Sequence, residues 1–189
     1  KMYKRNSYYY IFAPAGGVAT GWQLVLRSKN IYGPYEKKVV LKQGDTSVNG
    51  PHQGGYVELE SGESWFVHFQ DKDAYGRIVH LQPMSWENDW PIIGVDKDND
   101  GIGEPVMEHN KPEVSFKSEI KVPVTSDDFR GEEPGLQWQW HANPEDSWYS
   151  LSENEDSLRL YTKNISQKEE AVLWYAPNLL LQKFPAPSF

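Results

Sequence analysis

The chain has 189 residues, of which 38% are hydrophobic and 14% aromatic, enough apolar side chains to pack one domain or two small ones. Its formal net charge of -8 argues against a protein that binds nucleic acid through a basic face, and no apolar run approaches the roughly 18 residues of a membrane helix. Cysteine is absent, which excludes a disulfide framework, a thiolate nucleophile and cysteine-ligated zinc, and is compatible with cytoplasm, periplasm or the cell exterior.

Short runs rich in β-branched and aromatic residues recur along the first half of the chain, each bounded by Gly, Pro, Asn or Asp. They predict strands at Tyr8–Pro14, Trp22–Ser28, Lys37–Lys42, Gly55–Glu60, Ser64–Gln70 and Arg77–Pro83. Turn residues at 61–62 and at 87–89 predict two hairpins. Helical periodicity is hard to find anywhere. The pattern therefore predicts an all-β meander with antiparallel four-stranded sheets as its units.

The composition of the sequence changes between residues 104 and 125. This segment is rich in proline and charged residues and has only weak periodicity, which is typical of a linker that follows a surface. Short aromatic strands restart afterwards in "GLQWQWHANPEDSWYSL", "SLRLYT" and "AVLWYAPNLLLQKF". We therefore predict two units, residues 1–122 and residues 123–189, joined near Pro123. Lys1 leads at once into a strand-like run, so we expect the chain to begin within a fold.

The segment "DKDNDGIGE" at residues 96–104 carries Asp at alternating positions followed by Gly101. This is the opening half of a calcium loop, in which Asp oxygens contact the ion and a glycine permits the turn. The twelfth position is Met107, where a bidentate Glu is required, and no helical pattern flanks the loop. A solvated turn is the preferred interpretation, and a structural calcium ion is the alternative.

Three histidines stand out by their surroundings. His52 lies in the turn-rich stretch "NGPHQGGY", whose glycines allow the backbone to approach closely. Its imidazole is either a metal ligand or substrate contact, or a side chain that caps a turn, and composition alone favours the cap. His68 and His80 alternate with apolar residues in predicted strands, so we expect one in the core and the other facing solvent.

Arg77 and Trp22 each begin a predicted strand after a loop that contains glycine. A buried arginine at a strand start needs carboxylates or a polyhydroxyl ligand as partners, whereas a surface arginine needs none. Trp22 is either a flat stacking surface or a core residue. No two carboxylates stand in an apolar environment, and the sequence has no phosphate cradle, serine nucleophile elbow or His-x-x-x-His pair.

Four stretches resemble, in order, the later blades of glycoside hydrolase family 43: "KMYKRNSYYYIFAPAGGVATGWQLVLRSKNIYGPYE", "NGPHQGGYVELESGESWFVHFQD", "YGRIVHLQP" and "DGIGEP". A fifth, "LQWQWHANPEDSWYSL" through "LRLYT", resembles the start of the β-sandwich that follows the catalytic domain in many members. The resemblance implies a partial five-bladed β-propeller over residues 1–122 and part of a β-sandwich over residues 123–189. It also favours a periplasmic or secreted location over a cytoplasmic one.

The same resemblance implies roles for individual residues. His52 matches the histidine that points at the propeller axis, where several members hold a calcium or other ion through water. Arg77 matches the arginine that contacts the sugar in the innermost subsite, and Trp22 is the further candidate for substrate binding. The three catalytic acids of the family would all lie upstream of Lys1, with the general acid in a Glu-Gly-Pro motif immediately before it.

The sequence therefore predicts part of an inverting glycosidase that cleaves hemicellulose-derived xylosides or arabinofuranosides. Inversion needs an acid and a base carboxylate about 6.5–9.5 Å apart, and no credible pair is present, so we expect no catalytic residue here and no activity of the chain alone. The expected partners are a xylo- or arabino-oligosaccharide and the missing N-terminal blades, without nucleic acid or membrane. The alternatives are a non-catalytic carbohydrate-binding β-module and a structural β-domain.

Overall fold

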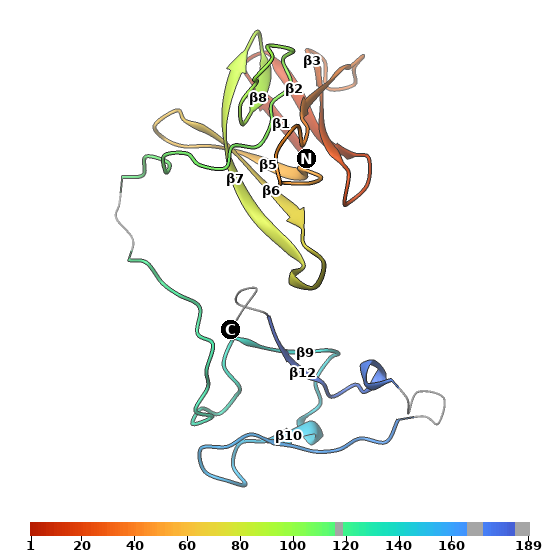
Figure 1. Cartoon of the computed structure of the whole chain (residues 1–189), viewed down its shortest axis with the longest axis vertical. Coiled ribbons are helices and arrows are strands. Elements are labelled where there is room, and N and C mark those ends of the chain that lie inside the picture. The colour runs from red at the N-terminus through yellow and green to blue at the C-terminus, as the bar shows by residue number, and fades with distance from the viewer. Residues whose placement is uncertain (116–118, 166–171, 184–189) are drawn as a thin grey trace. The chain divides into compact units, whose positions relative to one another are not determined.

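The computed structural model of the chain describes residues 1–115, 119–165 and 172–183. The chain divides into two compact units, Lys1–Lys117 and Ser118–Phe189, each with sheets of its own. Within the described residues, regular structure consists of β-strands and three short 3₁₀ turns (Figure 1). Nowhere in these residues is there a helix with the length and apolar character needed to cross a membrane.

The first unit begins with a four-stranded antiparallel sheet in which each strand pairs with its neighbour in the sequence. Its strands are β1 (Met2–Arg5), β2 (Tyr8–Ala15), β3 (Trp22–Ser28) and β4 (Glu36–Leu41). Asn6 turns the β1–β2 hairpin with a φ of 52°, a left-handed conformation that asparagine tolerates. Tyr10, Phe12 and Val25 lie on one face of this sheet, and that face is buried.

A second four-stranded sheet follows with the same simple order. Its strands are β5 (His52–Glu58), β6 (Ser64–Asp71), β7 (Arg77–Glu87) and β8 (Trp90–Ile93). Gly62, with a φ of 87°, turns the β5–β6 hairpin. Asn88 and Asp89, with φ of 51° and 59°, form a two-residue β7–β8 turn whose twist matches that of the strands. Both predicted hairpins are confirmed.

The start of β5 differs from the sequence-based prediction. We expected the strand to begin at Gly55 and placed His52 in a turn, but His52 pairs with Phe69 of β6. An irregularity between His52 and Gly55 interrupts the ladder, and pairing resumes on its far side, as at a β-bulge. His52 is therefore a strand residue, and its assignment to a loop was wrong.

One hydrophobic core joins the two sheets of the first unit. Its buried members are Tyr10, Phe12, Val25, Val40, Leu41, Phe66, Met84 and Ile93. Aromatic rings meet across the sheets: Phe12 stacks on Tyr56 and on Phe66, with ring centroids 6.3 and 5.9 Å apart. Stacked rings contribute beyond the apolar area that they bury. Because Phe12 belongs to β2 and its partners to β5 and β6, this core fixes one sheet on the other.

Arg27 of β3 holds the far hairpin of the second sheet against the first. Its guanidinium lies over the Trp90 ring, 4.1 Å from the centroid, and donates to the carbonyl oxygen of Asn88 at 2.7 Å. The Tyr10 hydroxyl donates to the carbonyl oxygen of Asp89 at 3.0 Å. These contacts add polar and cation–π attachment to the apolar packing, so the two sheets are joined at this rim as well as through their core.

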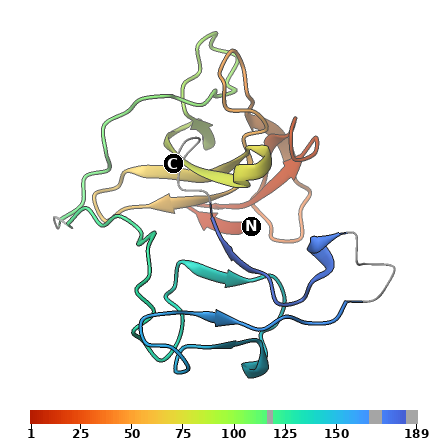
Figure 2. The ribbon, with the colours of Figure 1, turned by 60° about the horizontal axis from the view of Figure 1, so that its bottom comes forward.

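The second unit has only short strands in its described residues (Figure 2). They are β9 (Trp138–Trp140), β10 (Tyr149–Ser150), β11 (Arg159–Leu160) and β12 (Leu180–Gln182). β9 pairs with β12, and β10 with β11, both antiparallel. The all-β class is thus confirmed for both units. The finer division, in which blades end at residue 122 and the sandwich starts at residue 123, stays a prediction.

Candidate functional site

The three candidate residues each begin a strand of the first unit, namely β3, β5 and β7. The loops that precede these strands are residues 16–21, 42–51 and 72–76. The first two touch: the Asn49 side chain donates to the carbonyl oxygen of Ala19 at 3.1 Å. A Cβ atom on Gly50 would lie 2.4 Å from the carbonyl oxygen of Val18, so only glycine allows this approach. The strands that leave these connections begin with Trp22, His52 and Arg77.

His52 is buried, with 2% of its surface exposed. Its Nδ1 lies 2.6 Å from the carbonyl oxygen of Gly50, and because a carbonyl can only accept, Nδ1 carries the proton. In the neutral tautomer that this bond selects, Nε2 is the nitrogen able to accept from water or to bind a metal ion. Gly21 makes room for the ring, since a Cβ there would lie 2.8 Å from Cε1 of His52.

Trp22 opens β3 and directly follows Gly21 in the sequence. Its ring covers Gly16, where a Cβ atom would lie 2.3 Å from Cζ3 of the indole, so glycine is required beneath it. The residue is 37% exposed, which leaves part of the ring open to solvent. Trp22 is therefore not a core residue within the described part of the chain. The other interpretation from sequence, an indole ring on which a ligand can stack, remains.

Arg77 opens β7 and is exposed. The guanidinium carbon lies 4.7 Å from the centroid of the Phe69 ring. Within the described residues, the Arg77 guanidinium makes no side-chain hydrogen bond or ion pair, and its backbone pairs with Asp71 in the ladder. The Phe69 ring also contacts His52, with centroids 5.5 Å apart. The structure thus brings Arg77 and His52 to one phenylalanine, while Trp22 is linked to His52 through Gly21.

A neutral polar network supports this end of the sheets. The Gln70 side-chain amide donates to the carbonyl oxygen of Ser47 at 2.7 Å and to Oδ1 of Asn49 at 2.8 Å. Oε1 of Gln70 pairs with Nε2 of His80 at 3.1 Å. Because Asn49 also reaches Ala19, the network connects β6 and β7 to two of the three connections. Buried amides with all partners in place hold a loop in one arrangement.

The His68 and His80 rings stack face to face, 5.4 Å apart with an angle of 16° between their planes. They are directly paired across β6 and β7, so both point to the same face of the sheet. His68 is buried, whereas His80 is half-buried. The expectation that one of them faces solvent was wrong. Alternation within a strand does not show which residue of the next strand lies opposite, and here the register places the two histidines opposite each other. Burial lowers the pKa of His68 from 6.5 to about 4.

The acidic loop after β8 brings three carboxylates together. Oxygens of Asp96, Asp98 and Asp100 lie within 4.8 Å of one another. Oδ2 of Asp96 accepts from the backbone N–H of Gly101 at 2.8 Å, while its Oδ1 is buried without a hydrogen-bond partner in the described residues. The carboxylates therefore converge as the sequence pattern suggests.

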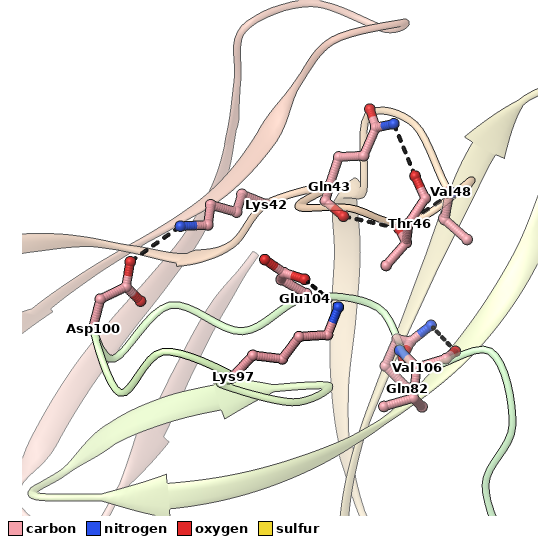
Figure 3. Close-up of polar contacts among 9 residues, drawn as sticks. All are labelled: Lys42, Gln43, Thr46, Val48, Gln82, Lys97, Asp100, Glu104 and Val106. Atoms are coloured by element: carbon pink, nitrogen blue, oxygen red, sulfur yellow. Dashed lines mark hydrogen bonds and ion pairs between the residues drawn. The ribbon is translucent and has the colours of Figure 1, made fainter.

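Two lysines neutralise part of this loop (Figure 3). Lys42 Nζ lies 3.0 Å from Asp100 and, through its hydrogen bond, holds the pKa of that carboxyl below its usual range. Lys97 Nζ lies 2.8 Å from Glu104. Met107, at the position of the missing bidentate ligand, is exposed. Calcium needs roughly six to eight oxygens, so these residues fit the ion only in part.

Two carboxylates of the second sheet, Glu58 and Asp71, lie at strand ends. Glu58, at the opposite end of β5, is exposed, accepts from the Tyr56 hydroxyl and lies 3.8 Å from Arg5. Asp71 ends β6 opposite Arg77. In the described residues the three aspartates after β8 are the one group of three or more acidic or histidine side chains whose ligand atoms lie within 4.8 Å of one another. The expectation that this chain lacks an acid–base pair is consistent with this arrangement and remains a prediction.

Sequence reasoning missed three residues that organise the site: Phe69, Gln70 and Asn49. Phe69 looks like any apolar strand residue, and only the pairing of β6 with β7 brings it to Arg77. Gln70 offered a usable signal, because it shares its face with His68, so two polar side chains follow one another on a face expected to be buried.

Comparisons with known proteins agree with this architecture. Residues 1–91 match the sequence model of "Glycosyl hydrolases family 43", and residues 126–189 match that of the "Beta xylosidase C-terminal Concanavalin A-like domain". The GH43 protein BlXynB of Bacillus licheniformis superposes with a TM-score of 0.79 at 26% identity, over 98% of this chain and 37% of that one. A bifunctional GH43-CE protein of Bacteroides eggerthii gives 0.73 at 31% identity, over 96% and 22%.

Among curated proteins, the chain is 47% identical over 178 residues to a putative β-xylosidase of Xylanibacter ruminicola, covering 89% of this chain and 34% of that protein. It is 32% identical over 176 residues to a non-reducing end α-L-arabinofuranosidase of Bacteroides ovatus, covering 84% and 31%. The chain thus spans about a third of the length of these relatives.

The first unit consists of two blade-like antiparallel sheets, and residues 126–189 match a Concanavalin A-like domain, so the class of fold is that of a β-propeller followed by a β-sandwich domain. The chain belongs to glycoside hydrolase family 43. The predicted fold class, a partial β-propeller followed by part of a β-sandwich, is confirmed.

His68 is expected to make the protein less stable in mild acid. Above pH 6.5 its ring is neutral in both the folded and the unfolded state and adds no pH dependence. Between pH 6.5 and about 4 the unfolded chain binds a proton that the folded protein does not, so the free energy of unfolding falls as the pH falls, by on the order of 3 kcal/mol. Denaturant unfolding over this range should show a smaller loss for His68→Gln than for the wild type.

A matched control for that experiment is His109→Gln, because His109 is an exposed histidine of the same unit. This variant should lose stability with acid as the wild type does. An unchanged loss in His68→Gln would show that the buried ring does not contribute to the acid sensitivity.

Proposed function

We propose that the chain is part of a glycosidase that cleaves the xylosides or arabinofuranosides of hemicellulose with inversion of configuration. The observation that carries this proposal is the environment of Arg77. Its guanidinium packs on the Phe69 ring and has no carboxylate partner in the described residues. A planar group with five free donors suits adjacent hydroxyls of a sugar. The enzyme names of the relatives, β-xylosidase and α-L-arabinofuranosidase, support the same substrate class.

The three candidate residues have different roles in this proposal. Arg77 donates to sugar hydroxyls, and Trp22 offers a ring face against which the apolar side of a sugar can lie. His52 cannot reach solvent freely, since it is buried, so its Nε2 accepts from a water molecule or binds a hydrated ion beneath the sugar. None of the three transfers a proton to or from the glycosidic bond.

The chemistry itself requires two carboxylates. An acid protonates the leaving oxygen, and a base, about 6.5–9.5 Å away, activates water on the opposite face of the ring. We place both upstream of Lys1 in the whole protein. This chain's residues would then bind and orient the sugar between groups supplied by other blades.

The outward face of the second sheet supports a role for further blades. Four aliphatic side chains on it are between 36% and 69% exposed: Val57, Val67, Val79 and Leu81. Val67 and Leu81 are directly paired, so the apolar side chains are contiguous. A patch of this kind on a soluble protein marks a contact surface. We propose that another blade of the same protein covers it, as the first sheet covers the opposite face.

A non-catalytic carbohydrate-binding module would also use exposed aromatic and arginine side chains. The comparisons do not favour it, because the matching proteins carry the names of hydrolases. The two functions differ in one observable, which is turnover.

Turnover with inversion tests the proposed function directly. The whole protein should release xylose from an aryl xyloside or arabinose from an aryl arabinofuranoside. Proton NMR of the sugar first released should show the anomer opposite to that of the substrate. The 189-residue chain by itself should show no turnover, because in this proposal the acid and the base belong to other blades. Sugar binding without hydrolysis by the whole protein would favour the binding module instead.

Arg77→Ala in the whole protein should lower kcat/KM by about 10- to 100-fold, because each buried sugar hydroxyl left unpaired costs about 1–3 kcal/mol. The loss should appear mainly as a higher KM with little change in kcat, since the hydroxyls are bound in both the ground state and the transition state. Arg130→Ala is the control, because Arg130 is an exposed arginine paired with Asp156 in the second unit. An unchanged kcat/KM in Arg77→Ala would remove Arg77 from the sugar site.

We also propose that the protein binds a structural calcium ion, held either by the acidic loop or, through water, by His52. Thermal unfolding of the whole protein with calcium and with a chelator tests for the ion, which should raise the Tm. Asp98→Asn removes a carboxylate charge from the acidic loop without breaking an ion pair, and His52→Ala removes the imidazole. The variant that abolishes the calcium-dependent rise identifies the site, and a Tm independent of calcium in the wild type would contradict the proposal.

A further inference from the structure

We infer that Phe69 is a positioning residue for sugar binding, which presents the guanidinium of Arg77 to the ligand. The inference rests on the proposed function, because it assigns a role at the same site. It comes from one arrangement in the first unit: a buried ring of β6 that contacts both Arg77 at the start of β7 and His52 at the start of β5.

The Arg77 contact has the geometry of a cation–π interaction. The guanidinium carbon lies 4.7 Å from the Phe69 centroid, within the roughly 6 Å over which the ring quadrupole attracts a cation. The chain turns back through residues 72–76 between β6 and β7, and Asp71 pairs with Arg77 in the ladder. Arg77 can therefore fold its side chain back over a ring two residues before the turn.

Phe69 itself is firmly held. It is 9% exposed, and its neighbours in the ladder are His52 on one side and Val79 on the other. The His52 ring lies against it at 48° with centroids 5.5 Å apart. A phenylalanine has two side-chain torsions, so a ring packed on both sides supplies a rigid support for a long and flexible arginine.

This support has a chemical advantage over an ion pair. A carboxylate partner would accept from the edge of the guanidinium and so occupy the donors that a sugar needs. An aromatic ring contacts the flat face instead and leaves the N–H groups in the plane free. The absence of a carboxylate partner for Arg77 in the described residues then follows from the function of the site.

Phe69 would otherwise be an ordinary core side chain, and Phe66 provides the comparison. Both are phenylalanines of β6, but Phe66 lies on the opposite face, fully buried in the core between the sheets. A purely structural role predicts that truncating either residue lowers stability and leaves sugar binding alone. A positioning role predicts a loss in sugar binding for Phe69 only, and one that depends on Arg77.

A double-mutant cycle in the whole protein separates these roles. The variants are Phe69→Leu, Arg77→Ala and their combination, with Phe69→Tyr to keep the ring and Phe66→Leu as the matched control. For each, kcat and KM on the aryl xyloside and arabinofuranoside are measured together with the Tm. Equilibrium binding of xylose and of arabinose by calorimetry gives a second readout that needs no turnover.

Phe69→Leu should lower kcat/KM by about three- to thirtyfold, the effect of a partly desolvated cation–π contact, and weaken sugar binding by a similar factor. The combined variant should be no worse than Arg77→Ala, because Phe69 acts through the guanidinium. Phe69→Tyr should retain most of the wild-type value, and Phe66→Leu should lower the Tm without changing kcat/KM.

Losses that multiply in the combined variant would overturn the inference, and so would equal effects of Phe69→Leu and Phe66→Leu. Those results would leave the proposed function intact, because the wild type would still hydrolyse the aryl xyloside or the aryl arabinofuranoside. A whole protein that neither hydrolyses nor binds these sugars would instead reject the proposed function, and the inference with it.

Discussion

The aromatic core between the two sheets is the constraint on which the rest of the first unit depends. Phe12 reaches from the first sheet to Phe66 in the second, and Arg27 fixes the same relation at the rim. Because both sheets are simple antiparallel meanders, fixing one on the other also fixes where their connections meet. His52 can then lie against Gly21, a contact between sheets that neither sheet could provide alone.

The strands could be predicted from sequence wherever alternation was regular. The prediction of Ser64–Gln70 matches β6 within one residue, whereas β7 was predicted only as far as Pro83 and continues to Glu87. The prediction failed at His52, because the irregularity before Gly55 breaks the period of two that strand recognition requires. It also failed for the exposure of His80, which depends on the register between two strands and not on either strand alone.

The site was only partly accessible to the same reasoning. Arg77, His52 and Trp22 could be named because their chemistry is distinctive and because the family resemblance assigns two of them a role. Phe69 could not be named, since its side chain is ordinary and its importance arises from non-local pairing with both neighbouring strands. The supports of a site are thus harder to foresee than the groups that contact a ligand, because they are defined by geometry.

The central claim is that a sugar binds at the starts of β3, β5 and β7. There the Arg77 guanidinium, held on the Phe69 ring, donates hydrogen bonds to it. A crystal structure of the whole protein with xylose or arabinose bound tests this most directly. The account predicts hydrogen bonds from the Arg77 guanidinium to two adjacent hydroxyls, with the flat face of that group still on Phe69 and His52 beneath the sugar. A sugar bound elsewhere, or Arg77 paired with a carboxylate of another blade and turned away from the ligand, would contradict it.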